Sequence, residues 1–280
     1  MSDIVKNQHY VPQFYLNYFA NKNGRIFVYD KINEKKFPSN SRGIASEGYF
    51  YDIIKGKMQS IEKYLNRDYE SAFSKYLPSL IQRLENDEDF YLTSDDKKEI
   101  ASFLSLQYVR TKRFREESVR LFTSQDIYHS EAFLPPKMGH IILFSDPDLL
   151  DNISANLLQN YYWVIGKNET SEFFYTSDNP FAQRESMREV HKKHQKEFAD
   201  FSLLSYEIAL PLTPKYLITF YIKDKQFEEL KDIDGTVYSF NKDNVQWFNN
   251  LQFMKCYRQL YSCTDDFTFV ENIWGMMGGE

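Results

Sequence analysis

Six polar residues in this chain stand in aromatic or apolar surroundings, and their types suit acid–base catalysis and the binding of an anion. His9 lies in QHYVPQFYL, just ahead of a proline. Because a residue before proline avoids the α conformation, Val11 should be extended and a helix should begin at Pro12. His9 would then precede a helix N-terminus, where anions are favoured. It is interpreted either as a general acid–base or anion contact, or as a histidine that only caps or packs.

Gln107 and Arg110 lie in FLSLQYVRTKRF, where they share one helical face with two phenylalanines. Both side chains should therefore lie on or beside an apolar stripe. A buried arginine needs a charged partner or an anionic ligand. Arg110 is interpreted either as a clamp for phosphate or carboxylate, or as one half of an internal salt bridge to a helix glutamate such as Glu62 or Glu70.

Asp178 and Asn179 follow the apolar run FFYTS and begin a turn at TSDNP. A carboxylate at the end of a strand, on a loop held by a rigid scaffold, is a frequent catalytic placement. An Asx-Pro turn, in which the aspartate bonds its own backbone, is the alternative.

Asn249 lies on a helix in WFNNLQFMKCYRQLYS and should point inward with Val245, Phe253 and Cys256. A buried asparagine must find hydrogen-bond partners. We expect it to brace the helix against a loop, with contact to a ligand as the alternative.

The periodicity of apolar residues predicts the elements that must position these side chains. Helices are expected at residues 60–86, interrupted or kinked at Pro78, and at 94–122, 147–159 and 241–261. Strands are expected at 25–30 and 48–53, and as two hairpins that pair 161–166 with 172–177 and 207–212 with 216–222.

The order of these elements predicts an α+β fold, because helices cluster in the middle of the chain and strands at the two flanks. A central long-helix bundle should pack against an antiparallel sheet built from strands of the N-terminal part and the C-terminal half. No linker is visible, so residues 1–280 are expected to form a single domain. The charged segment 183–200 is expected to be a mobile insertion.

Composition restricts the class of protein. The chain has 24 Phe, 21 Tyr and a net charge of −6, which argues against broad binding of duplex nucleic acid. A small nucleotide or a single-stranded end fits that charge better. With two cysteines, no signal-like N-terminus and no long apolar run, we expect a cytoplasmic protein that does not associate with membranes. Exposed aromatic residues could support a homo-oligomer.

Common local signatures of cofactor and metal chemistry are missing from the sequence, including GxGxxG, the P-loop, HExxH, GxSxG and CxxC. His191 and His194 have a spacing that suits a metal, but their charged surroundings indicate a solvated face. The sequence therefore assigns no metal site and no cofactor.

Several short segments follow one another in an order that resembles a known family. They are HYVPQFYL, GYFY, the pair Glu62 and Glu70, LQYVRT, TSDNP, PLTP and FNNLQ…YS. The order resembles the bacterial domain of unknown function 4238 family over nearly the whole chain, and HYVPxFYL followed by SDNP is its most specific part. One departure is RTKRF, where a proline would be expected soon after RT.

The resemblance implies a bacterial or phage-borne cytoplasmic protein, of the kind often encoded in mobile elements and defence neighbourhoods, but it implies no activity. His9, Gln107, Arg110, Asp178 and Asn249 resemble the signature polar positions of the family.

These residues lead to one hypothesis, namely that they converge on a pocket for a phosphate-containing substrate. His9 would be the acid–base, and Asp178 would orient it or hold a metal. Arg110 would bind the anionic group, and Gln107, Asn249 and Asn179 would fix the orientation of the substrate. The leading hypothesis is a nuclease-like or nucleotide-processing effector that hydrolyses phosphodiester bonds. The alternatives are a non-catalytic sensor for a ligand or partner, and a purely structural polar network.

Overall fold

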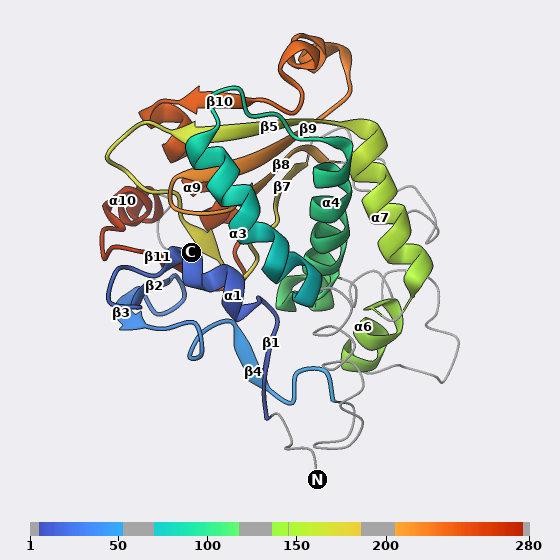
Figure 1. Ribbon diagram of the computed structural model, residues 1–280. Helices are drawn as coiled ribbons and strands as arrows, with labels where there is room; N and C mark the ends of the chain where they lie inside the picture. The colour runs from blue at the N-terminus through green and yellow to red at the C-terminus, as the bar shows by residue number, and fades with distance from the viewer. Residues whose placement is uncertain (1–5, 53–69, 118–135, 145, 186–204, 277–280) are drawn as a thin grey trace. The chain divides into compact units, whose positions relative to one another are not determined.

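The computed structural model describes residues 6–52, 70–117, 136–144, 146–185 and 205–276 (Figure 1). Contacts between Cα atoms divide the chain into two compact units, which are described separately. Unit 1 comprises residues 1–12, 46–161 and 185–204, and unit 2 comprises 13–45, 162–184 and 205–280. Helices dominate unit 1 and strands dominate unit 2, so the chain is an α+β protein, as the sequence predicts.

Unit 1 combines a helical bundle with a two-stranded ribbon. Its helices are α3 (Ser71–Asn86), α4 (Ser94–Val109), α6 (Pro136–Phe144), α7 (Pro147–Asn160) and a short helix at 112–117. In this bundle α4 packs against α3, α6 and α7. The ribbon pairs β1 (Asn7–His9) with β4 (Ser46–Gly48) in antiparallel register, so that His9 lies opposite Ser46.

Local sequence explains where α4 begins. Thr93 and Asp96 form a capping box, in which each side chain bonds the backbone N–H of the other. The carboxylate of Asp96 also accepts the Tyr76 hydroxyl at 2.7 Å and Arg83 Nη1 at 3.1 Å, which ties α3 to α4. Stacked rings of Phe73 and Phe103, with centroids 3.9 Å apart, pack the same two helices together.

Unit 2 contains two sheets. The five-stranded sheet has the order β10-β5-β9-β8-β7, with bounds Val237–Phe240, Tyr161–Asn168, Tyr216–Ile222, Ser205–Pro211 and Ala182–Glu185. The four-stranded sheet has the order β3-β2-β11-β6, with bounds Lys35–Ser39, Ile26–Asp30, Gln259–Ser262 and Thr176–Ser177. β8 and β9 form the expected hairpin, whereas β5 and β10 run parallel.

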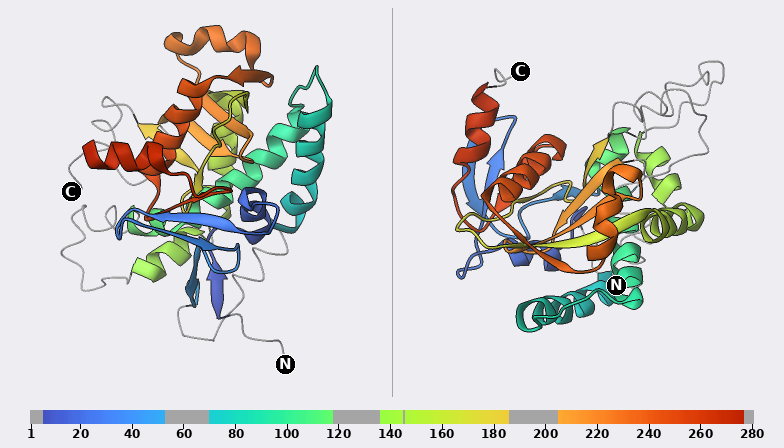
Figure 2. Two further views of the ribbon diagram at one scale, coloured as in Figure 1. Left: turned by 90° about the vertical axis from the view of Figure 1, so that its left-hand side faces the viewer. Right: turned by 90° about the horizontal axis from the view of Figure 1, so that it is seen from above.

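The remaining elements of unit 2 are helical: α1 (Gln13–Leu16), η1 (Asn17–Phe19), η4 (Lys225–Ile233), α9 (Lys242–Lys255) and α10 (Thr268–Met276). An apolar cluster that includes Phe174, Leu217 and Val245 lies under α9. A second cluster, which includes Phe253, Leu260 and Val270, joins α9 and α10 to the four-stranded sheet. In the right-hand view of Figure 2, α10 lies beside the β2–β3 hairpin.

Several expected element boundaries are wrong. The helix expected at 94–122 is interrupted at Arg110 and Thr111, because the Thr111 hydroxyl accepts the Phe114 N–H at 3.2 Å and begins a new helix. The helix expected at 241–261 begins after its Asn241 cap but ends at Lys255, and the following residues form strand β11.

Two expected strand pairings also differ from the structure. Residues 161–166 do not pair with 172–177, because β5 lies between β10 and β9 while β6 pairs with β11. The strand expected at 48–53 is instead β4, which ends at Gly48, and Tyr49 has a φ of 55°. The helix expected from Pro12 begins one residue later, at Gln13.

Other expectations fall partly outside the described residues. Helix α3 continues through Pro78, while residues 60–69 of the helix expected there are not described. Of the insertion expected at 183–200, residues 183–185 belong to β7 and the rest lies outside the described part. The single domain expected over residues 1–280 stays a prediction.

Candidate functional site

The centre of the candidate site in unit 1 is the guanidinium of Arg110, whose side chain is 1% exposed. Its Nη1 lies 2.7 Å from Glu70 Oε1, its Nη2 donates to the backbone oxygen of His9 at 2.6 Å, and its Nε contacts the Tyr51 hydroxyl at 3.3 Å. The internal salt bridge to Glu70 is the alternative that the sequence left open. Burial acts to lower the pKa of Arg110, but Tyr51 and Glu70 outweigh it and raise that pKa, so the guanidinium is charged.

The end of α4 explains why Arg110 points at the ribbon. Arg110 is the C-cap residue, and its backbone N–H still bonds the Leu106 carbonyl at 3.0 Å. Because the helix stops here, the side chain leaves the last turn toward β1. Because α4 ends at this position, Arg110 reaches His9, which lies 101 positions away in the sequence.

Gln107 holds the next carbonyl of the same segment. Its Nε2 donates to the backbone oxygen of Tyr10 at 3.1 Å. This bond fixes the orientation of the amide, since the reverse orientation would face oxygen with oxygen. Its Oε1 is buried and has no hydrogen-bond partner among the described residues. Arg110 and Gln107 therefore hold consecutive carbonyl groups, while His9 itself is partly exposed on β1.

Residues that the sequence reasoning missed complete this support. Gln8, which is fully buried, donates to Asp52 Oδ1 at 2.8 Å and accepts the Tyr51 N–H at 2.6 Å. The position of Gln8 next to His9, and of Tyr51 and Asp52 in GYFYD, was the available signal. These bonds connect β1 to the segment that follows β4, in addition to the backbone pairing of the two strands.

A second buried cation, Arg115, contacts Phe50, which follows strand β4 of the ribbon. Arg115 donates through Nη2 to the Phe50 carbonyl at 2.8 Å, and its guanidinium carbon lies 3.5 Å from the centroid of the Phe50 ring. His140 lies between Arg115 Nε, 3.1 Å from its Nδ1, and the Val109 carbonyl, 2.7 Å from its Nε2. The carbonyl can only accept, so Nε2 carries the proton. Burial, reinforced by the charge of Arg115, lowers the pKa of His140 to about 3.

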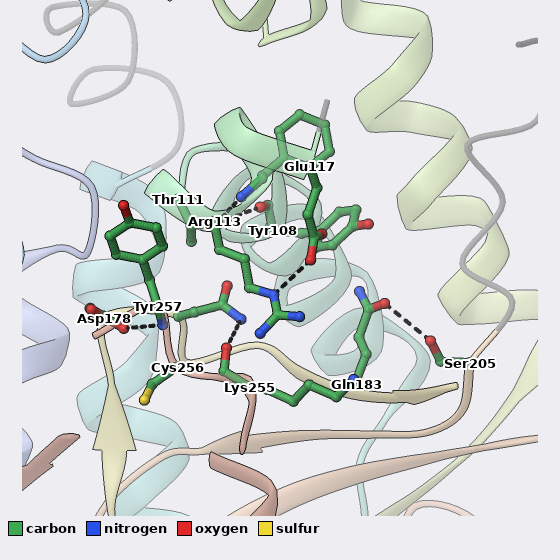
Figure 3. A network of polar contacts seen from close by, with 12 residues as sticks. Tyr108, Thr111, Arg113, Glu117, Asp178, Gln183, Ser205, Lys255, Cys256 and Tyr257 are labelled. Carbon is green, nitrogen blue, oxygen red and sulfur yellow. Dashed lines mark hydrogen bonds and ion pairs between the residues drawn. The ribbon is translucent and has the colours of Figure 1, made fainter. Parts of the chain in front are cut away.

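Asp178, in unit 2, is 1% exposed and binds backbone N–H groups (Figure 3). Its carboxylate accepts from Tyr257 at 2.7 Å, Arg258 at 2.8 Å and Gln259 at 2.9 Å. Burial raises its pKa to about 6, against the opposing effect of these three donors and of Lys31. The carboxylate fixes the turn that connects α9 to β11, and a catalytic role for Asp178 stays a prediction.

The other two candidates in unit 2 also bind the main chain. Asn249 accepts the Tyr175 N–H at 2.8 Å and donates to the Phe173 carbonyl at 2.9 Å, as expected for an asparagine that braces a helix against a loop. Asn179 donates to the Lys255 carbonyl at 3.0 Å, near the C-terminus of α9. Gln252, which the sequence reasoning missed, bonds Ser177 Oγ and the Pro180 carbonyl, both at 2.8 Å.

The structure thus groups the candidates into two sets. His9, Gln107 and Arg110 belong to one set in unit 1. The other three lie in unit 2, where Asp178 and Asn179 bind the main chain near the junction of α9 and β11, and Asn249 binds the 173–175 segment. A single pocket that joins the two sets stays a prediction. Glu62, His191 and His194 lie outside the described residues.

The described residues contain no group of three or more His, Cys, Asp or Glu side chains placed to hold a metal ion. No helix in the described part of the chain is long and apolar enough to span a membrane.

The chain is an α+β protein in which buried polar side chains hold the main chain at QHYVP and SDNP, the two segments most specific to the resemblance. The family model described as "Protein of unknown function (DUF4238)" matches residues 7–266, and the chain belongs to this family. No curated protein and no solved structure matches the chain.

Proposed function

We propose that the chain is a nuclease-like or nucleotide-processing effector in which His9 acts as a general acid–base on a phosphodiester bond. The observation that carries this proposal is the support behind His9. Arg110 and Gln107 hold the carbonyls of residues 9 and 10, while the His9 side chain is partly exposed. A catalytic side chain needs a backbone fixed in this way, since small displacements reduce rates strongly.

In the proposed reaction a water molecule attacks phosphorus as His9 accepts its proton. The new P–O bond forms while the bond to the leaving oxygen breaks, and that oxygen takes a proton from solvent. Positioned proton transfer of this kind contributes about 10²- to 10⁴-fold to rates. Arg110 is then a positioning residue, because its Nη1, Nη2 and Nε are engaged by Glu70, His9 and Tyr51. Its side chain is also only 1% exposed, which argues against direct contact with the substrate anion.

In the alternative function, a sensor, the same residues bind a ligand or partner but catalyse no reaction. It is favoured by one observation, the buried Gln107 Oε1 that lacks a partner among the described residues. An acceptor in this state costs about 1–3 kcal/mol, which a donor group of a bound ligand would recover.

The test combines expression in bacteria with a purified assay. Wild type and His9→Ala are expressed, and RNA, DNA and nucleotide pools are profiled. The affected class is then offered to the purified proteins. We expect the wild type to deplete one class, and His9→Ala to lose at least about 100-fold in rate at unchanged thermal stability. Equal rates would contradict catalysis by His9, and ligand binding without turnover would establish the sensor.

A further inference from the structure

The hairpin formed by β2 and β3 in unit 2 is basic, although the chain as a whole is acidic. Residues 22–42 contain six Lys or Arg and two Asp or Glu, against a net charge of −6 for the whole chain. Both acidic residues are engaged: Asp30 lies 2.6 Å from Arg258 Nη2, and Glu34 accepts the Trp274 indole N–H at 3.0 Å. Six cations against two carboxylates, one of which pairs with Arg258, leave this segment with a net positive charge.

Two of the six basic residues are also engaged. Lys31 donates to the Cys256 carbonyl at 2.8 Å, and Lys36 lies 3.0 Å from Glu271. The other four are exposed and form no ion pair within the described part of the chain; they are Lys22, Arg25, Lys35 and Arg42. Because they compensate no internal charge, they are available to an external anion.

An exposed aromatic ring lies between these cations. Phe37 is 39% exposed and shares a face of edge strand β3 with Lys35, two residues before it. Arg25 directly precedes β2 and Arg42 follows β3, so both lie at the end of the hairpin opposite Lys35. The five residues of β2 separate the two ends by about 13 Å. The cations thus lie at both ends of the hairpin, with Lys22, Arg25 and Arg42 at one end and Lys35 at the other.

Protection of the edge strand explains part of this composition, since lysine and proline on an edge prevent pairing with another chain. That explanation covers Lys35, Lys36 and Pro38 on β3. It does not cover Lys22, Arg25 and Arg42, which lie outside that strand, nor the exposed ring of Phe37.

We propose that this basic hairpin surface (Lys22, Arg25, Lys35, Phe37 and Arg42) binds single-stranded nucleic acid. A row of cations follows a phosphate backbone, and an aromatic ring stacks on a base. A single strand fits better than a duplex, because its bases are free to stack. The inference deepens the proposed function and rests on it, since it names a surface of unit 2 with which the proposed effector would bind nucleic acid.

Fluorescence anisotropy with labelled single-stranded DNA and RNA 12-mers tests the surface, in a His9→Ala background that keeps the oligonucleotide intact. Lys35→Glu/Arg42→Glu should weaken binding at least about tenfold at low salt and reduce the salt slope by about 1.4. The matched control is Lys225→Glu/Lys231→Glu, which makes the same charge change at exposed residues of η4. Its affinity should stay within about twofold of the parent.

Substitution of the ring separates stacking from charge. Phe37→Leu should weaken binding roughly tenfold with an unchanged salt slope, whereas Phe37→Tyr should bind normally. Equal losses in the charge variant and its control, or no loss in either, would overturn the proposal. Competition by polyglutamate as effective as competition by the oligonucleotide would also overturn it, in favour of an acidic peptide partner.

The two proposals fail in different ways. Binding through the hairpin without cleavage by the wild type contradicts the proposed function and leaves this surface intact. Cleavage with an unchanged KM in Lys35→Glu/Arg42→Glu contradicts the surface and leaves catalysis by His9 intact.

Discussion

The guanidinium of Arg110 donates to the backbone carbonyl of His9 at 2.6 Å, while its other side contacts Glu70 at 2.7 Å. One buried charge thus connects the start of α3, the end of α4 and the first strand of unit 1. The ribbon depends on this residue for its position.

The pair of buried Arg110 and partly exposed Glu70 should be coupled. Arg110→Met and Glu70→Leu should each destabilise the protein by about 3–5 kcal/mol, because each leaves one charge without its partner. The double variant should recover part of that loss. Urea unfolding measures all three, and additive losses would show that the pair is not coupled.

Asp178 should hold the turn between α9 and β11. In Asp178→Ala three backbone N–H groups lose their acceptor, so hydrogen exchange at residues 257–259 should accelerate. Asp266→Ala is the matched control, because Asp266 is an aspartate of the same unit whose carboxylate accepts the Thr268 N–H at 3.1 Å instead of an N–H of residues 257–259. Unchanged protection of residues 257–259 in Asp178→Ala would contradict this role.

Asn249 and its neighbour Asn250 form a natural pair for comparison. Asn249→Ala removes both bonds to the 173–175 segment and should cost about 2–3 kcal/mol. Asn250 Oδ1 is buried without a hydrogen-bond partner in the described part of the chain, so Asn250→Ala should be nearly neutral. Thermal and urea unfolding measure the difference, and similar losses in the two variants would contradict the assignment.

His140 should make unit 1 sensitive to acid. Its pKa is lowered to about 3 by burial and Arg115, so its contribution to stability is complete above the unfolded pKa of 6.5 and declines as the pH falls toward 3. Between pH 7.5 and pH 5 the loss should be about 2 kcal/mol.

Asp178 acts in the opposite direction, because its raised pKa favours proton uptake by the folded state as the pH falls. The measurement is therefore a difference between wild type and His140→Gln, in which the contribution of Asp178 cancels. Parallel stability curves for the two proteins from pH 7.5 to pH 5 would show that His140 is not responsible.

Local patterns predicted the α+β class, the β8–β9 hairpin and the inward direction of Gln107, Arg110 and Asn249. These patterns failed to predict features that depend on contacts between distant segments of the chain. β6 pairs with β11 about 80 residues away, so the apolar run FFYTS resembled half of a local hairpin. The break after Val109 was not predicted, because the apolar stripe continues to Phe114. Within that stripe the Thr111 hydroxyl caps the start of a second helix.

The candidate residues were identified because each is a polar side chain in an otherwise apolar stretch or on an apolar face. Their partners were not predictable from the sequence, because the partners are mostly backbone carbonyl and N–H groups, which every residue carries. The sequence therefore located Arg110 and Asp178 but suggested substrate contacts for groups that bind the main chain in the structure.

The rate at which purified protein cleaves a single-stranded oligonucleotide, measured as kcat/KM for wild type and His9→Ala at equal stability, tests the central claim most directly. The account predicts a loss of at least about 100-fold in His9→Ala. A kcat/KM for His9→Ala equal to that of the wild type would contradict it.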